Sequence, residues 1–149
     1  MKRMQTISVQ VVQEFSASAE RVFDAWLKPD MLNKWMFGRA LRDEEVIHLK
    51  LEPKVGGRFS FMVKRQGEEI DHVGTYREIV RPNRLVFSWG IAGFSDNENE
   101  SIVFIDIILN KNSCELTLTH ELDAKWAEYK DRSKEGWTKM LGALDDLLD

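Results

Sequence analysis

The side chains in this sequence that could bind a metal or act as nucleophiles are few and far apart. Three histidines and one cysteine are the candidates, and they occur at His48, His72, Cys114 and His120. No two of them have the CxxC, HxH or HExxH spacing that brings ligands to one metal ion. The sequence therefore predicts neither a metal site nor a bound cofactor.

Motifs for nucleophilic catalysis and phosphate binding are also missing. Cys114 has no histidine beside it, and the chain contains no GxSxG segment, so neither a thiol nor a serine nucleophile is indicated. Gly56-Gly57 is not followed by the Lys-Ser/Thr of a phosphate-binding loop, and it precedes a predicted strand rather than a helix.

His120 is the titratable residue that the pattern places inside the protein. It follows Leu116 and Leu118 at two-residue spacing, so all three side chains point to the same inward face of a strand. Burial disfavours a charged imidazole, and we expect His120 to resist protonation. Two interpretations stay open: a core histidine bonded to a hydroxyl or carbonyl group, or an acid–base catalyst with Tyr76 or Asp71 as its proton partner.

The element that must position these groups is a long helix predicted over residues 123–148. Apolar residues recur there at three- and four-residue steps, which predicts one buried face. That face contains Trp126, Tyr129, Ser133, Trp137, Met140, Leu141, Leu144, Leu147 and Leu148. Gly136 and Gly142 each cost a helix about 1 kcal/mol relative to alanine. They indicate either close approach of a backbone or ligand, or simply two tolerated glycines.

The N-terminal part of the chain predicts one strand and two short helices. Alternation from Ile7 to Phe15 is typical of a half-buried strand. Ser18 is suited to cap the helix that follows, and Pro29 to begin the next, because its ring fits the first helical position. The predicted apolar faces contain Val22, Phe23, Trp26 and Leu27 in the first helix, and Met31, Leu32, Trp35 and Met36 in the second.

The middle of the chain predicts consecutive antiparallel strands, because turn residues separate short alternating segments. These strands cover residues 47–51, 58–64, 70–80, 85–89, 101–109 and 114–122. In the second of them, Phe59, Phe61 and Val63 are expected to face inward. Residues 92–100 form the longest irregular stretch, which is either a lid carrying Phe94 or a solvated hairpin loop.

Length and charge narrow the class of protein. The chain has 149 residues, a net charge of −4 and a pI near 5.5, which fit one domain over residues 1–149 without a basic surface for nucleic acid. Residues 1–10 lack the apolar core of a signal peptide, and no apolar run is long enough to span a bilayer. A single cysteine excludes an intrachain disulfide and fits a reducing compartment. We expect a cytoplasmic protein that neither binds nucleic acid nor inserts into membranes.

Several short motifs, taken in order, resemble one known family. They are Pro53-Lys54-Val55-Gly56-Gly57, Gly74-Thr75-Tyr76-Arg77-Glu78-Ile79, Pro82-Asn83-Arg84-Leu85, Trp89, Leu116-Thr117-Leu118-Thr119-His120 and Gly136-Trp137. From about Val11 to Leu148 the chain is similar to the activator of heat-shock-protein-90 ATPase homologue-like family, in the START-like (SRPBCC) superfamily. The resemblance implies an α+β helix-grip fold, in which a curved seven-stranded antiparallel sheet wraps around the C-terminal helix and two short helices follow the first strand. It also implies a hydrophobic cavity between sheet and helix.

The chain departs from the family pattern at Gln66-Gly67, at Ser113-Cys114 and at Phe104, all expected in turns or on the outer sheet face. Eukaryotic members that stimulate the chaperone are longer and carry a separate N-terminal domain, for which this chain has no room. The resemblance therefore implies a fold and does not imply chaperone activation.

The predicted function is binding of a small apolar or amphipathic ligand between the sheet and the C-terminal helix. The predicted ligand-binding residues are Trp35, Phe59, Phe61, Tyr76, Trp89, His120, Trp137 and Leu141. One alternative is a cyclase- or hydrolase-like enzyme that uses His120, which an acid–base pair within about 3 Å, facing an open cavity, would favour. The other is a protein-interaction or cochaperone-like module, which a closed cavity and an exposed apolar patch would favour.

Residues 101–109 also predict a contact surface for a homodimer, because both faces of this strand are apolar. Val103, Ile105, Ile107 and Leu109 are expected inward, and Ile102, Phe104 and Ile108 outward beside Thr117 and Thr119. An antiparallel sheet covered on one side normally has a polar outer face, and an apolar patch there usually marks an interface. Isolated exposed residues, or cover from residues 92–100, are the alternatives.

Overall fold

The computed structural model describes residues 6–93 and 101–149, so most of the predicted lid, including Phe94, lies outside the described residues. The strands are β1 (Thr6–Phe15), β2 (Glu45–Leu51), β3 (Arg58–Arg65), β4 (Glu68–Val80), β5 (Arg84–Ile91), β6 (Ser101–Asn110) and β7 (Ser113–Asp123). The helices are α1 (Ala19–Asp24), α2 (Pro29–Trp35) and α3 (Lys130–Leu148), and a 3₁₀ segment, η1 (Ala124–Tyr129), precedes α3. This architecture confirms the predicted α+β helix-grip fold.

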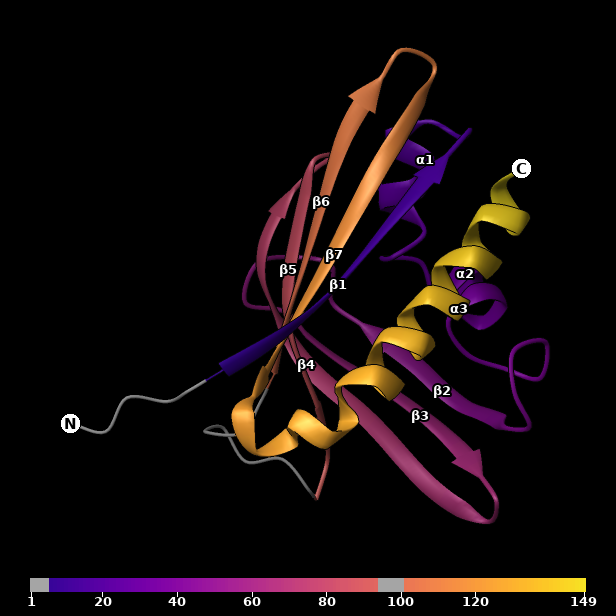
Figure 1. Cartoon of the computed structure of the whole chain (residues 1–149). Coiled ribbons are helices and arrows are strands. Elements are labelled where there is room, and N and C mark those ends of the chain that lie inside the picture. Colours follow the sequence, from indigo (N-terminus) through magenta and orange to yellow (C-terminus); the bar gives the residue numbers. More distant parts are fainter. Residues whose placement is uncertain (1–5, 94–100) are drawn as a thin grey trace.

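All seven strands form one antiparallel sheet in the order β1-β7-β6-β5-β4-β3-β2. The sheet is strongly twisted, and α3 runs along its inner face while α1 and α2 lie near one end of that helix (Figure 1). Helix α3 packs mainly on β1 and beside α2. The inward side chains of the strands and the buried faces of the helices form one hydrophobic core.

The two short helices begin where the sequence predicts. The Ser18 side chain accepts a hydrogen bond from the Arg21 N–H (3.2 Å), which satisfies a backbone donor that the first turn of α1 would otherwise leave free. Pro29 begins α2, where a missing N–H costs nothing. Trp26, just after α1, and Trp35, at the end of α2, both point into the core, with their rings 4.6 Å apart.

The long helix begins later than predicted, at Lys130 rather than at residue 123. The Asp123 side chain accepts a hydrogen bond from the Lys125 N–H (3.0 Å), and Trp126 has a non-helical backbone (φ −97°, ψ 17°), so the chain forms a 3₁₀ segment there. Trp126 and Tyr129 are consequently 38% and 41% exposed, and their predicted place on the buried face is wrong. Of that predicted face, four members are buried: Trp137, Leu141, Leu144 and Leu148.

The expected close approach of another backbone at the two helical glycines is not found among the described residues. A Cβ atom added at Gly136 or Gly142 would meet nothing within 4 Å. Gly74 in β4 is a glycine that the fold does require, because a Cβ there would lie 2.0 Å from the Ser88 carbonyl oxygen and 2.5 Å from the Phe59 ring. Gly74 therefore lets an aromatic side chain lie flat on the sheet.

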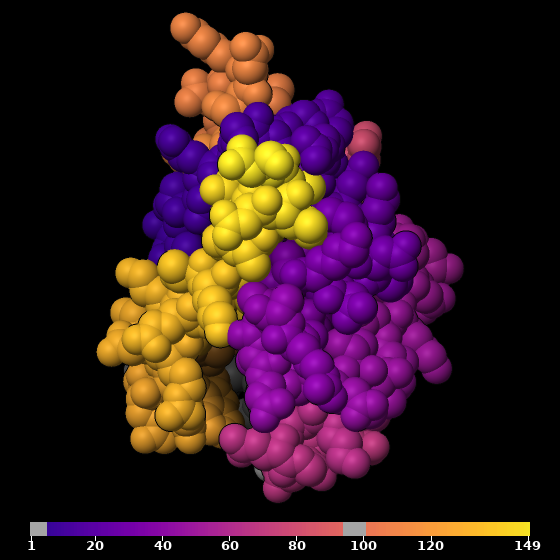
Figure 2. Space-filling view, turned by 90° about the vertical axis from the view of Figure 1, so that its right-hand side faces the viewer, coloured from indigo at the N-terminus to yellow at the C-terminus, as the bar shows by residue number. Residues whose placement is uncertain are grey.

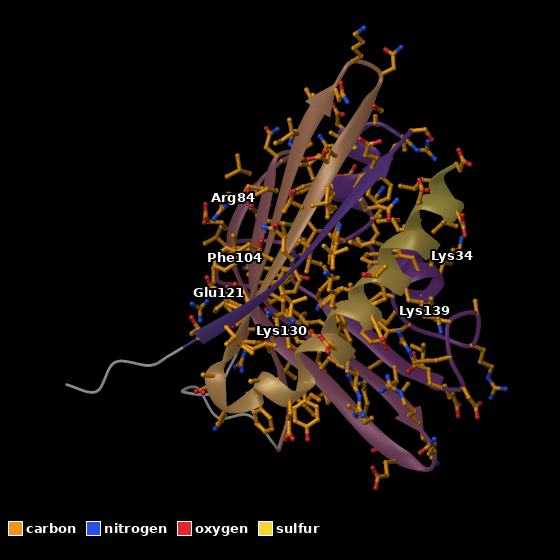
Figure 3. The ribbon with its side chains drawn as sticks, in the orientation of Figure 1. Lys34, Arg84, Phe104, Glu121, Lys130 and Lys139 are labelled. Carbon is orange, nitrogen blue, oxygen red and sulfur yellow. The ribbon has the colours of Figure 1, made fainter. Side chains whose placement is uncertain are left out.

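The outer face of β6 is less apolar than the sequence predicts. The Arg84 guanidinium lies 5.6 Å from the centre of the Phe104 ring and forms an ion pair with Asp106 (2.6 Å), on the side of the sheet away from α3 (Figure 3). Ile108 stays exposed. Leu109, predicted inward, is 62% exposed, because the β6–β7 hairpin extends beyond the elements that cover the inner face (Figure 1). The inward residues that are buried as predicted are Val103, Ile105 and Ile107.

No described helix has the length and apolar character needed to cross a bilayer.

Candidate functional site

A small, largely buried cavity lies between the sheet and the segment that carries α1 and α2. Seven side chains line it: Trp26, Met36, Phe59, Phe61, Tyr76, Phe87 and Trp89. Its volume is about 10 Å³, which is at the lower limit for one water molecule. The aromatic rings therefore fill most of the space that the fold offers between sheet and helices.

Strand alternation brings most of the lining together. Phe59 and Phe61 point inward from β3 with their rings stacked at 4.6 Å, and Tyr76 and Phe87 lie opposite each other in the β4–β5 register. The turn before β3 fixes the position of Tyr76. Gly56, at a positive φ of 86° that other residues rarely adopt, donates its N–H to the Tyr76 carbonyl (2.8 Å).

Four of the eight residues predicted to bind ligand line this cavity, namely Phe59, Phe61, Tyr76 and Trp89. The other four do not line it. Trp35 is fully buried and donates its indole N–H to the Ala25 carbonyl (3.0 Å), and Leu141 is buried on α3. Trp137 lies behind the lining, 5.5 Å from Trp89 between ring centres. His120 contacts Trp137 rather than the cavity.

Sequence reasoning missed three lining residues, Trp26, Met36 and Phe87, although it placed Trp26 and Met36 on apolar helix faces. A signal for Phe87 was present, because it shares the inward face of β5 with Trp89 at two-residue spacing. Nothing local indicates that Trp26 and Met36 meet β3 and β5, because that contact depends on how the α1–α2 segment folds back over the sheet.

Trp26 differs from Trp35 and Trp137 in the hydrogen bonding of its indole N–H. Only 3% of the residue is exposed, and its indole N–H has no hydrogen-bond partner among the described residues. Trp26 Nε1 is the only buried side-chain nitrogen or oxygen atom among the described residues that lacks a hydrogen-bond partner. The indole N–H groups of Trp35 and Trp137, in contrast, both donate to acceptors inside the protein. A buried donor without an acceptor is destabilising by about 1–3 kcal/mol.

His120 forms a directed hydrogen-bond chain from α3 to β5. The Trp137 indole N–H donates to His120 Nδ1 (3.0 Å), so the ring proton resides on Nε2 and is donated to Ser101 Oγ (2.7 Å). Ser101 in turn donates to the Trp89 carbonyl (2.7 Å), and Ser133 Oγ lies 3.2 Å from Nδ1. Burial lowers the pKa of His120 to about 4, so the imidazole is neutral at pH 7. This geometry matches the core-histidine interpretation.

Neither predicted proton partner forms a hydrogen bond to His120 in the described structure. Asp71 points to the outer face of the sheet, where it accepts from Ser60 Oγ (2.7 Å). Tyr76 packs against Phe59 and Phe87, and burial raises the pKa of its hydroxyl, which therefore stays protonated. The acid–base pair that would favour an enzyme is not formed among the described residues.

The space beside the first half of α3 is hollowed. Figure 2 shows a depression between η1 with the first turns of α3 and the segment running from α2 into β2. Gly136 in this part of α3 has open space around its Cα, and further along the helix Lys139 donates from Nζ to the Leu41 carbonyl. Of the residues that line the cavity, only Trp89 is partly exposed. Solvent therefore approaches the aromatic cluster at Trp89.

A buried carboxylate holds the segment at residues 38–44. Glu44 accepts from the Gly38 N–H (2.8 Å) and forms ion pairs with Arg42 (3.0 Å) and Arg65 (2.6 Å). Burial favours the neutral acid, but the hydrogen bonds from Gly38 and Arg65 outweigh it and lower the pKa of Glu44. The sequence predicts only a charged connection here. The carboxylate instead ties this segment to the β3–β4 hairpin.

The family model described as "Activator of Hsp90 ATPase homolog 1-like protein" matches residues 16–149. The chain belongs to this family. The predicted resemblance is thereby confirmed over nearly the whole length of the chain, and the family's helix-grip architecture is the one observed.

Solved structures similar to this Hsp90 ATPase activator homologue-like protein come from several bacteria. A Chromobacterium violaceum protein has a TM-score of 0.80 at 21% identity, covering 95% of this chain and 96% of that one. A Staphylococcus aureus protein of unknown function has a TM-score of 0.82 at 15% identity, covering 97% and 94%. A Cytophaga hutchinsonii protein has a TM-score of 0.77 at 22% identity, covering 99% and 96%. At these identities the likeness shows the fold alone. Among curated proteins none matches the chain.

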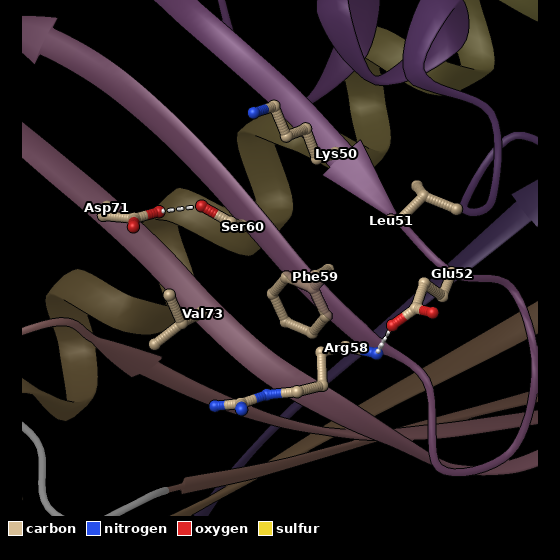
Figure 4. Close-up of a pocket in the computed structure, with 8 residues that line it drawn as sticks. All are labelled: Lys50, Leu51, Glu52, Arg58, Phe59, Ser60, Asp71 and Val73. Carbon is tan, nitrogen blue, oxygen red and sulfur yellow. Dashed lines mark hydrogen bonds between the residues drawn. The ribbon is translucent and has the colours of Figure 1, made fainter.

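This family member also has a larger groove, on the opposite face of the sheet. It has a volume of about 340 Å³ and lies over β2, β3 and β4, open to solvent (Figure 4). Its lining has no net charge, because it contains two cations, Lys50 and Arg58, and two carboxylates, Glu52 and Asp71. The Ser60 hydroxyl donates a hydrogen bond to Asp71, so it accepts one from the Nε2–H of His48 (2.9 Å). The groove is polar and open, so the enclosed aromatic cavity is the better candidate for an apolar ligand.

Proposed function

We propose that this protein binds a small apolar or amphipathic ligand between its sheet and helices, in the space now filled by the aromatic cavity lining. The observation that carries the proposal is the lining itself. Six aromatic side chains and one methionine converge from three strands and the α1–α2 segment on a single enclosed point. Ligand pockets for apolar molecules are lined in this way, with few polar groups.

Ligand entry requires the cavity to open, because about 10 Å³ is far below the roughly 300–1,000 Å³ of typical ligand pockets. Two features support an opening beside the first half of α3. Trp89 is partly exposed, so its ring can leave the lining without crossing the core. Gly136 leaves open space on the helix, so a ligand or a displaced ring meets no side chain there.

Native mass spectrometry of protein purified from its own host tests the proposal, by detecting a retained small molecule. Trp89→Ala should lose that molecule by widening the opening, and a matched change in the outer groove, Ser60→Ala, should keep it. Loss from Ser60→Ala but not from Trp89→Ala would move the binding site to the outer groove. Protein that never retains a molecule, and takes up no apolar probe, would contradict ligand binding and favour the interaction-module alternative, for which a closed cavity is expected.

A further inference from the structure

We infer that the ligand of the aromatic cavity is a neutral molecule with a hydrogen-bond acceptor, such as a carbonyl or ether oxygen, and that Trp26 Nε1 donates to this acceptor. The inference rests on the proposed function and adds the chemical class of the ligand. It begins from Trp26, which lines the cavity and whose buried indole N–H lacks a partner among the described residues. Native proteins rarely leave such a donor unpaired, so each case calls for an explanation.

The polar groups of the lining are mostly donors. Trp26 and Trp89 carry indole N–H groups, which donate and cannot accept, and Tyr76 carries a hydroxyl that does both. A trapped water needs two to four polar partners, and the cavity is at the lower limit of size for one. A ligand acceptor pairs the Trp26 donor directly while its apolar body lies among the rings.

The surroundings of the cavity disfavour a charged ligand. The lining contains no Asp, Glu, Lys or Arg. The nearest imidazole rings are neutral at pH 7, because burial lowers the pKa of both His72, whose ring lies 5.3 Å from Trp89, and His120. A carboxylate or ammonium group inside would therefore lose its hydration without gaining a counter-charge, which is strongly unfavourable.

Three matched probes test this reading of the site: acetophenone, α-methylstyrene, which replaces the carbonyl oxygen by a CH₂ group, and benzoate. Binding is followed by two-dimensional ¹H–¹⁵N NMR, with the Trp26 indole signal assigned from Trp26→Phe. Acetophenone should bind about fivefold more tightly than α-methylstyrene, the difference expected for one neutral hydrogen bond. It should also move the Trp26 indole proton downfield, and benzoate should not bind.

Trp26→Phe removes the donor and keeps an aromatic ring, so it should abolish the preference for acetophenone over α-methylstyrene. Trp137→Phe is the matched control, because its indole N–H donates to His120 and not into the cavity. It should keep the preference, whatever it does to the affinity for either probe. Both tryptophans are 3% exposed, so each variant removes the same atoms from a buried side chain.

The outcomes distinguish a failure of the inference about the ligand's acceptor from a failure of the proposed ligand binding. If both neutral probes shift the lining signals but bind equally, with the Trp26 indole unmoved, the inference is overturned and the proposed function stands. Benzoate binding more tightly than acetophenone overturns the inference in the same way. If no probe shifts any lining signal, the proposed function fails, and the inference fails with it.

Discussion

Acid should destabilise this protein through His120 before its carboxylates are protonated. The neutral ring accepts from Trp137 and donates to Ser101, so a second ring proton on Nδ1 would oppose the Trp137 N–H. Burial lowers the pKa of His120 from 6.5 to about 4 in the folded protein. The unfolded chain therefore binds a proton that the folded protein resists, and stability falls as the pH drops from about 6.5 towards 4.

The size of the effect follows from the two pKa values. At 1.36 kcal/mol per pKa unit, the change from 6.5 to about 4 corresponds to about 3 kcal/mol in total. Well above pH 6.5, His120 is neutral in both the folded and the unfolded protein, so this loss of stability is absent. Between pH 7 and pH 5 the linkage relation gives a loss of about 2 kcal/mol from His120 alone.

Urea unfolding at pH 7, 6 and 5 measures this loss, with His120→Gln as the comparison because its amide does not titrate. His72 is also buried with a lowered pKa and acts in the same direction in both proteins, so the difference between wild type and variant isolates His120. The wild type should lose about 2 kcal/mol more than the variant between pH 7 and pH 5. Equal losses, or an NMR titration of His120 near pH 6.5, would refute the reasoning.

The remaining predictions concern stability and association. Trp137→Ala should lower the free energy of unfolding by about 3–5 kcal/mol, since it removes a large buried side chain; a loss below about 1 kcal/mol in urea would contradict its burial. Gly142→Ala should raise the free energy of unfolding by about 0.5–1 kcal/mol, and with it the midpoint of thermal unfolding, because a Cβ meets nothing there. Gly74→Ala should lower the free energy of unfolding by about 2 kcal/mol or more. A destabilised Gly142→Ala would show an unseen contact. Glu44→Gln should cost about 1–3 kcal/mol in chemical denaturation by removing the charge shared by two arginines, and an unchanged midpoint would count against that network. If the protein dimerises through the outer face of β6, Phe104→Glu should yield folded monomers in sedimentation; a monomeric wild type at micromolar concentration would exclude the dimer.

Local physical rules predicted most of the fold. Alternation placed Phe59 and Phe61 on the inner face, and Ser18 and Pro29 marked the starts of two helices, because caps and strand faces depend on neighbouring residues. The rules failed at residues 123–129, where helical spacing of aromatic residues competed with a local side-chain cap at Asp123. The cap determined the backbone, and the aromatic residues became exposed.

The candidate site was only partly predictable, because its two halves come from different kinds of contact. Lining residues on strands share a face that alternation reveals, so Phe87 could have been inferred with Trp89. Trp26 enters through the folding back of α1 and α2 over the sheet, and its missing hydrogen-bond partner depends on every atom around it. The burial of Glu44 could not be predicted for the same reason, because Arg65, one of the residues that stabilise its charge, is distant in sequence.

The pairing of the first strand with the last constrains how the protein can be made. Among the described strands β1 pairs only with β7, so residues 6–15 join the sheet only after residues 113–123 have been made. A ribosome has thus synthesised more than four-fifths of the 149 residues before the sheet can be completed. The inner face then still lacks α3, which follows β7 in the chain. Such distant pairing slows folding, so we expect β1 to be among the last strands to join the sheet.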